Sequence, residues 1–142
     1  MTTPAFPCEA RGSFDVKLTP SPPYDTEHGM SLGHLTVDKR FHGPLEAVGL
    51  VHMISARSSA RPSAAYVAVE RIVGTLEGRE GGFVVTHVGV MDRGAASLEI
   101  RIVADSGFGA LAGIAGTMAI DIVEGQHFYT LRYALPDPSP PA

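Results

Sequence analysis

The fold is decided by residues 69–89, VERIVGTLEGREGGFVVTHVG, in which two runs rich in β-branched residues flank a glycine-rich centre. Valine and isoleucine favour strands, and a short glycine-containing link between two such runs is typical of a β-hairpin. The stretch therefore predicts a long antiparallel hairpin at the centre of the chain.

Alternation of apolar and polar residues continues on both sides of this hairpin. It covers residues 12–18, 35–42, 45–55, 65–77, 98–102, 118–122 and 128–135. Most links between these runs are short and none carries a helical pattern, which excludes a parallel βαβ sheet. Closing an antiparallel sheet removes its exposed edges. We therefore expect an all-β protein, a small closed antiparallel up-and-down barrel of about eight strands.

Length and composition indicate one globular domain. The chain has 142 residues, of which 44% are hydrophobic and 18% charged, and this balance argues against disorder. Both ends are rich in proline, which cannot donate a hydrogen bond to a strand ladder. We expect a loose N-terminal segment over residues 1–9, a single barrel domain over 10–135 and a Pro-rich flexible tail over 136–142.

Charge and cysteine content limit which partners and which cellular compartment are expected. A formal net charge of -4, without a run of basic residues among aromatics, argues against nucleic acid. Cys8 is the only cysteine, so no internal disulfide can form, which favours a reducing compartment. The first residues lack the basic and apolar regions of a signal peptide, and no apolar run approaches the roughly 20 residues that span a bilayer. We expect a soluble cytoplasmic protein that does not bind membranes.

Short motifs of glycine, aromatic and charged residues recur between residues 10 and 134. They are Ala10-x-Gly12-x-Phe14, Phe41-x-Gly43-x-Leu45, Glu70-Arg71-x-x-Gly74-x-Leu76-x-Gly78-Arg79-x-Gly81-x-Phe83, His87-x-Gly89, Ser106-Gly107 and Leu111-x-Gly113-x-x-Gly116. Together they resemble a bacterial family of uncharacterised proteins, a domain of unknown function with an allene-oxide-cyclase-like β-barrel. The resemblance implies a small closed barrel. It implies no reaction, because the family has no agreed activity.

The first candidate for chemistry is the pair Glu70 and His87. A four-residue turn over 78–81 places Ile72 opposite His87 and Glu70 opposite Gly89, so that Glu70 and His87 are diagonal neighbours on one face. A carboxylate beside an imidazole in an apolar barrel can act as a general base with its orienting partner. The alternative is an ordinary polar contact at the barrel mouth. A one-residue slip in the turn would place the two side chains on opposite faces.

Three further residues are candidates for ligand binding. His52 shares its strand face with Glu46, Val48 and Leu50, and Tyr129 lies with Leu131 and Tyr133 on one face of the last strand. Arg71 lies on the face opposite the acid–base pair, among valines, and must be paired wherever it sits. It either binds an anionic ligand or pairs with Glu99 or Asp121 of a neighbouring strand.

A metal site has weaker support. A turn at residues 43–44 that opposes Phe41 to Glu46 leaves His34 and His42 on one face and His52 on the other. There is no His-x-x-x-His helix and no supporting cysteine. No metal site is therefore predicted.

A glycine-rich segment over 106–116 follows the expected strand at 98–102. Such a segment can form a dinucleotide-binding turn when a helix and a second parallel strand follow it. Here hairpins precede it and further glycines interrupt any helix. It is predicted to be a loop at the barrel rim, and no cofactor is expected.

Three functions fit this sequence. The barrel binds a small, largely apolar molecule; or it is a cofactor-free isomerase or cyclase in which Glu70 or His87 moves a proton; or it is a packed structural barrel whose outer faces serve self-association as a homo-oligomer. The sequence does not decide whether the chain is an enzyme.

Overall fold

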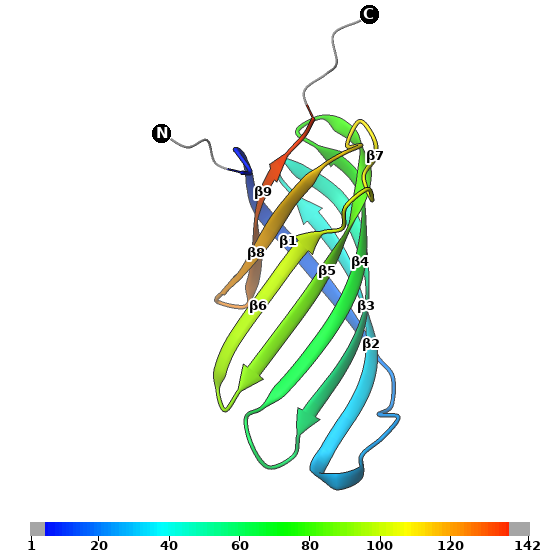
Figure 1. Cartoon of the computed structure of the whole chain (residues 1–142), viewed down its shortest axis with the longest axis vertical. Helices are drawn as coiled ribbons and strands as arrows, with labels where there is room; N and C mark the ends of the chain where they lie inside the picture. Colours follow the sequence, from blue (N-terminus) through cyan, green and yellow to red (C-terminus); the bar gives the residue numbers. More distant parts are fainter. Residues whose placement is uncertain (1–4, 137–142) are drawn as a thin grey trace, which may run out of the picture.

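The protein is built almost entirely from β-strands in a computed structural model that describes residues 5–136 (Figure 1). The strands are β1 (Cys8–Pro20), β2 (Met30–His42), β3 (Leu45–Ser58), β4 (Ala64–Leu76), β5 (Arg79–Asp92), β6 (Ala95–Ile102), β7 (Phe108–Gly109), β8 (Ala115–Val123) and β9 (Gln126–Ala134), with one 3-10 turn over Glu27–Gly29. β1 begins inside the expected loose segment 1–9. Residues 1–4 and 137–142 of the two expected end segments lie outside the described residues.

The strands close into a barrel in which every neighbouring pair is antiparallel. The order around the barrel is β1, β2, β3, β4, β5, β6, β8 and β9, and β9 pairs again with β1. The two-residue strand β7 attaches to the start of β5. The expectation of a closed up-and-down antiparallel barrel with eight strands in its wall is confirmed.

The central hairpin consists of β4 and β5, but its turn is shorter than expected. Glu77 and Gly78 form a two-residue turn, both with positive φ of 49° and 82°, and Leu76 pairs with Arg79. A tight hairpin turn of this kind needs positive φ at both positions, which glycine supplies at the second. Glu70 therefore faces Val85, not Gly89, and the predicted register is wrong. The shift is four residues, an even number, so the predicted faces are preserved.

The strand register of the hairpin formed by β2 and β3 differs from the prediction by one residue. Phe41 pairs with Ala47 and not with Glu46. Since a one-residue slip moves a side chain to the other face, His34 and His52 lie on the same face. Their rings stack with centroids 5.7 Å apart. The expectation that these two histidines lie on opposite faces is wrong.

One half of the barrel is packed solid. Buried residues alternate with exposed residues along β3 and β4, as expected for a strand with one face toward a core. The loop between β6 and β8 crosses this end of the barrel and buries Leu111 and Ile114. The interior here is filled by large side chains, among them Phe14, Phe41, Leu45, Ile72, Leu76, Phe83, Tyr129, Leu131 and Tyr133.

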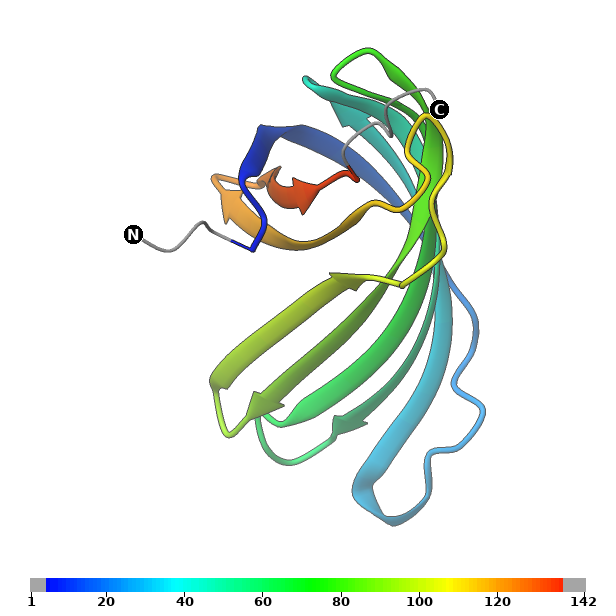
Figure 2. The ribbon, with the colours of Figure 1, turned by 45° about the horizontal axis from the view of Figure 1, so that its top comes forward.

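The other half of the barrel is open on one side. β2 to β5 are 13 or 14 residues long, whereas β6, β8 and β9 have only eight or nine. β8 meets β6 in two residue pairs only. Figure 2 shows β2 to β6 continuing as a curved wall beyond β8 and β9. The inner face of this wall buries a small second cluster, Val37, Val51 and Ala68.

Candidate functional site

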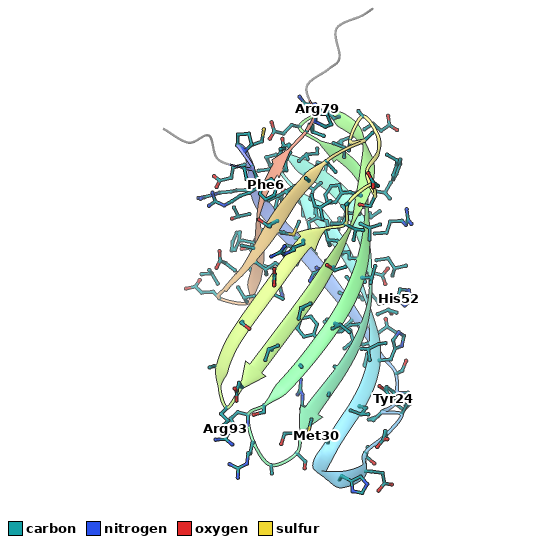
Figure 3. The ribbon with its side chains drawn as sticks, viewed as in Figure 1. Phe6, Tyr24, Met30, His52, Arg79 and Arg93 are labelled. Carbon is teal, nitrogen blue, oxygen red and sulfur yellow. The ribbon has the colours of Figure 1, made fainter. Side chains whose placement is uncertain are left out.

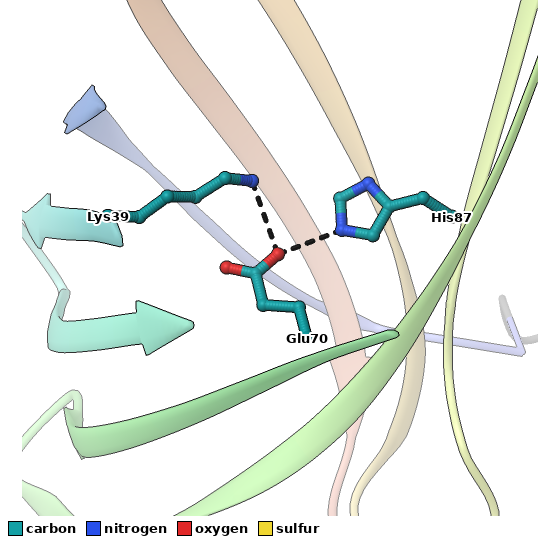
Figure 4. Close-up of polar contacts among 3 residues, drawn as sticks. All are labelled: Lys39, Glu70 and His87. Carbon is teal, nitrogen blue, oxygen red and sulfur yellow. Dashed lines mark hydrogen bonds and ion pairs between the residues drawn. The ribbon is translucent and has the colours of Figure 1, made fainter. Parts of the chain in front are cut away.

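Three ionisable side chains meet inside the barrel, between the two hydrophobic clusters (Figure 4). Lys39 comes from β2, Glu70 from β4 and His87 from β5. Glu70 Oε1 lies 2.8 Å from His87 Nε2 and 3.2 Å from Lys39 Nζ. The exposed fractions are 0% for Glu70, 4% for His87 and 9% for Lys39. The predicted proximity of Glu70 and His87 is therefore present, with a lysine added.

Two hydrogen bonds connect the three side chains of this cluster. The ammonium group of Lys39 donates a hydrogen bond to Glu70 Oε1, and such a bond is strong when the acceptor is a carboxylate. With the carboxylate ionised, His87 donates its Nε2–H to the same oxygen. The buried group then carries no net charge, which avoids the cost of an unpaired buried ion. Figure 4 shows the second ring nitrogen of His87 on the side away from the carboxylate.

Two features shape the surroundings of Glu70. Its other oxygen, Oε2, is buried and has no hydrogen-bond partner within residues 5–136. A side chain at Gly49 would place its Cβ 2.3 Å from Oε2, so the carboxylate approaches this strand only because residue 49 is glycine.

The ammonium group of Lys39 lies near two aromatic rings. Its Nζ is 5.0 Å from the ring centroid of Phe14 and 5.8 Å from that of Phe41. These aromatic faces stabilise the buried cation.

Lys39 was not among the predicted site residues, although the sequence carries a signal for it. It occupies a position in β2 that alternates with Val37 and Phe41 on the inner face. A lysine at an apolar position of an alternating strand must be paired when the strand is half buried. The buried acid that pairs with it lies 31 residues away in the sequence, on β4, and the registers of β2 and β4 on β3 bring the two side chains together across Gly49.

A hollow of about 690 Å³ opens in the inner face of the curved wall, at the unplugged end of the barrel. Its apolar lining includes Leu35, Met53, Tyr66, Met91 and Leu98, and its charged lining consists of Arg57 and Arg61. Gly89, also in the lining, lies two residues from His87 on the same face of β5, which is about 7 Å along the strand. The ionisable cluster thus lies one layer of side chains below the hollow.

His52 and Arg71 lie elsewhere, on the outer face of the barrel. Both line a second hollow of about 820 Å³ outside β2, β3 and β4, and Figure 3 shows His52 pointing away from the barrel. Arg71 forms no salt bridge within residues 5–136, while Glu99 pairs with Arg101. The predicted pairing of Arg71 with Glu99 is therefore wrong, and none with Asp121 forms. Within the described residues Arg71 thus has no ion-pair partner, and it lies near Val69 and Val73 of the same strand.

Tyr129 is buried in the packed half, away from the 690 Å³ hollow. Its hydroxyl donates to the carbonyl of His42 at 3.0 Å and accepts from the amide of Leu45 at 3.1 Å. Burial raises the pKa of Tyr129. These contacts hold the turn between β2 and β3 against β9, and a ligand-binding role for Tyr129 stays a prediction.

Other kinds of site are absent from the part of the chain that the structure describes. Residues 5–136 contain no group of three or more His, Cys, Asp or Glu side chains placed to hold a metal ion. The same residues include no helix long and apolar enough to cross a membrane. The cytoplasmic location, the absence of a cofactor and the lack of nucleic-acid binding stay predictions from the sequence.

Comparison with known proteins places the chain in a family. The model of the family described as "Protein of unknown function (DUF3224)" matches residues 10–133. The chain belongs to the DUF3224 family. The expected resemblance to a family of uncharacterised proteins is thereby confirmed, while likeness to allene oxide cyclases stays a prediction.

A solved structure agrees with this DUF3224 assignment. It is the crystal structure of a DUF3224 family protein of unknown function from Shewanella oneidensis MR-1. The two chains are 45% identical, the match covers 91% of this chain and 98% of the other, and the TM-score is 0.85. No curated protein matches the chain. The family thus supplies the fold and leaves the function to be argued from the site.

Proposed function

We propose that this DUF3224 barrel binds a small, largely apolar molecule in the hollow at its open end. The observation that carries the proposal is the contrast between the two halves of the barrel: one is filled by aromatic and aliphatic side chains, and the other leaves about 690 Å³ over an apolar floor. Ligand sites typically measure about 300 to 1,000 Å³, with mostly apolar walls and a few polar groups.

The lining also suggests which molecules to try first. Among residues 5–136, the charged side chains in the lining are Arg57 and Arg61, and hydroxyl groups come from the serines at positions 55, 58, 63 and 97. An arginine is well suited to a carboxylate. A compact apolar acid is therefore the first probe, with its tail toward Met53 and Leu98 and its carboxylate toward the arginines.

Binding is tested by calorimetric titration of the whole chain with octanoic acid and with octan-1-ol. We expect binding of at least one of the two, and its loss in Met53→Arg and Leu98→Arg, which place a long charged side chain in the hollow. Val123→Arg introduces the same side chain on the exposed end of β8 and should leave binding intact. Absence of binding for both probes, or equal binding by all variants, would contradict the proposal.

A second candidate function is supported by the 2.8 Å contact between Glu70 and His87. In this function the barrel is a cofactor-free isomerase. His87 does not line the hollow, so the carbonyl end of the bound molecule must reach the layer below it. Nδ1 of His87 then removes the α-proton of a β,γ-unsaturated carbonyl compound, and the electron pair moves into the carbonyl to give a dienolate. Glu70 stabilises the imidazolium, which returns the proton to the γ-carbon, so that the double bond moves into conjugation with the carbonyl.

Proton transfer is measured as incorporation of deuterium next to the carbonyl of nonan-2-one in heavy water, followed by NMR. We expect the native chain to accelerate exchange, and His87→Gln and Glu70→Gln to abolish the acceleration. His52→Gln removes an imidazole from the outer face and serves as the matched control. Exchange that persists in both inner variants would exclude this role, and binding without exchange would leave the barrel a binding protein.

A further inference from the structure

The outer face of β3, β4 and β5 is unusually apolar. Antiparallel sheets normally present polar side chains on the face that meets solvent. Within residues 5–136, eight of the seventeen large hydrophobic residues that are exposed lie together on this one face. We call this set the outer patch: Val48, Leu50 and Ile54 of β3, Val67, Val69 and Val73 of β4, and Val88 and Val90 of β5.

The strand register makes the outer patch continuous. Val48 pairs with Val73, and Ile54 pairs with Val67, which in turn pairs with Val88. Exposed apolar residues scattered singly need no explanation, whereas a contiguous patch of several hundred Å² marks an interaction site. We propose that the outer patch binds a second copy of this chain, giving a two-fold symmetric dimer.

The dimensions fit a dimer interface. From residue 48 to residue 56 of β3 the face extends about 27 Å, and with the flanking strands β2 and β6 it spans about 19 Å between the outermost strand axes, roughly 510 Å² in flat projection. A stable interface buries about 800 Å² of accessible surface on each partner. Pleated side chains have more accessible area than their projection, so an interface of standard size would use nearly the whole face.

Charges on the face match a second copy better than an unrelated apolar surface. Asp38, Leu50 and Arg71 form one row across β2, β3 and β4. Neither Asp38 nor Arg71 forms a salt bridge within residues 5–136. In a face-to-face dimer with its axis along β3, the patch residues of β3, Leu50 among them, meet their own counterparts, and β4 of each chain faces β2 of the partner. Asp38 of each chain then faces the partner's Arg71, so that both free charges are paired twice by one symmetry operation.

The test is the mass of the full chain in solution, by analytical ultracentrifugation from micromolar to millimolar concentration. We expect twice the 14.9 kDa of the chain. Val67→Lys places a cation in the patch and should raise the dissociation constant at least about thirtyfold, as for an interface hot spot. Val123→Lys is the matched control, because Val67 and Val123 are both 55% exposed and only Val67 lies in the patch.

A charge exchange tests the arrangement itself. Arg71→Asp should weaken the dimer, because it faces Asp38 of the partner, and Asp38→Arg with Arg71→Asp should restore it. Both positions are exposed, so far-UV circular dichroism should be unchanged in each variant. A monomer at all concentrations, or a dimer indifferent to Val67→Lys, would overturn the proposal, and a monomer that binds lipid vesicles would assign the patch to a membrane. A double variant that stays weak would overturn the pairing of Asp38 with Arg71.

Discussion

At the scale of the residue, Glu70 is the side chain on which the interior depends. One of its oxygens accepts hydrogen bonds from both Lys39 and His87, and no part of its surface meets solvent. The pair of opposite charges is tolerated because each ion neutralises the other. Removal of one member leaves the other buried and unpaired, so a single substitution should cost more than removal of both.

We expect Lys39→Met to lower the free energy of unfolding by about 3 to 5 kcal/mol, the range for a broken buried ion pair. Denaturant titration measures the loss. Arg101→Met breaks the exposed pair with Glu99 and should cost about 1 kcal/mol or less. Lys39→Met with Glu70→Leu should be more stable than Lys39→Met alone. If Lys39→Met and Arg101→Met have equal effects, the cluster does not carry a buried charge pair.

Tyr133 links stability to alkaline pH. Burial and the 2.9 Å hydrogen bond to Glu77 raise the pKa of Tyr133 from 10.0 to about 12. The folded chain thus holds this proton more tightly than the unfolded chain does. Stability contributed by the neutral hydroxyl is complete below pH 10 and is lost as pH rises from about 10 to about 12.

Thermal unfolding between pH 9 and 12 should therefore show a melting temperature that falls less steeply for Tyr133→Phe than for the native chain. Tyr24→Phe is the control, because Tyr24 is 62% exposed and should leave the slope unchanged. Identical slopes in all three proteins would show that Tyr133 does not titrate differently on folding.

At the scale of the element, the hairpins decide which side chains meet. The turn at Glu77 and Gly78 sets the register of β4 against β5, and with it the contact of Glu70 with His87. β3 also contributes, because its residue closest to the Glu70 carboxylate is a glycine, Gly49. The site therefore needs the correct register of β4 against β5 and, on β3, a residue without a side chain.

We predict that Gly49→Ala lowers stability by about 1 to 3 kcal/mol, since the new Cβ would lie 2.3 Å from Glu70 Oε2 and 3.1 Å from the Phe41 ring. The measurement is chemical denaturation. Gly33→Ala is the matched control, because its Cβ would meet only Ser55 Oγ at 3.6 Å, an ordinary contact. A Gly49→Ala chain as stable as the Gly33→Ala chain would mean that the carboxylate can move away freely.

At the scale of the whole molecule, unequal strand lengths divide the barrel into a plugged half and an open half. The wall is complete only where the short strands β8 and β9 are present, and the loop before β8 covers that end with Leu111 and Ile114. The long strands β2 to β5 run beyond it and leave their inner faces partly uncovered (Figure 2). This asymmetry creates the hollow in which we propose that a ligand binds.

Leu111→Ala should lower the free energy of unfolding by about 2 to 5 kcal/mol, because it leaves a cavity in the plug of the packed half. Phe108→Ala truncates a larger but exposed side chain in the same loop and should cost less. Denaturant unfolding of both variants measures the difference. If Phe108→Ala proves the more damaging, the loop packs through β7 and not through Leu111.

The sequence by itself determined the architecture and two of the three residues of the buried cluster, Glu70 and His87. Strands with alternating polarity and short links predict a closed antiparallel sheet. This could be predicted because the side-chain period and the length of each link are local properties of the sequence. Glu70 and His87 were predicted on one face although the turn was wrong, since an even register error preserves the faces. At the β2–β3 turn the register error was one residue, so His34 and His52 were predicted on opposite faces although they lie on the same face.

Only the tertiary structure decided which face of each strand is inside, and therefore what each charged residue does. Both faces of β3 and β4 are rich in valine and other apolar residues, so local pattern could not distinguish core from outer patch. The registers of β2 and β4 on β3 place Lys39 beside Glu70 across Gly49, and the curvature of the barrel leaves Arg71 outside. The physical reason is that alternation along a strand fixes only relative orientation. The direction of the core is set by strands far apart in the sequence, when they pair around the barrel.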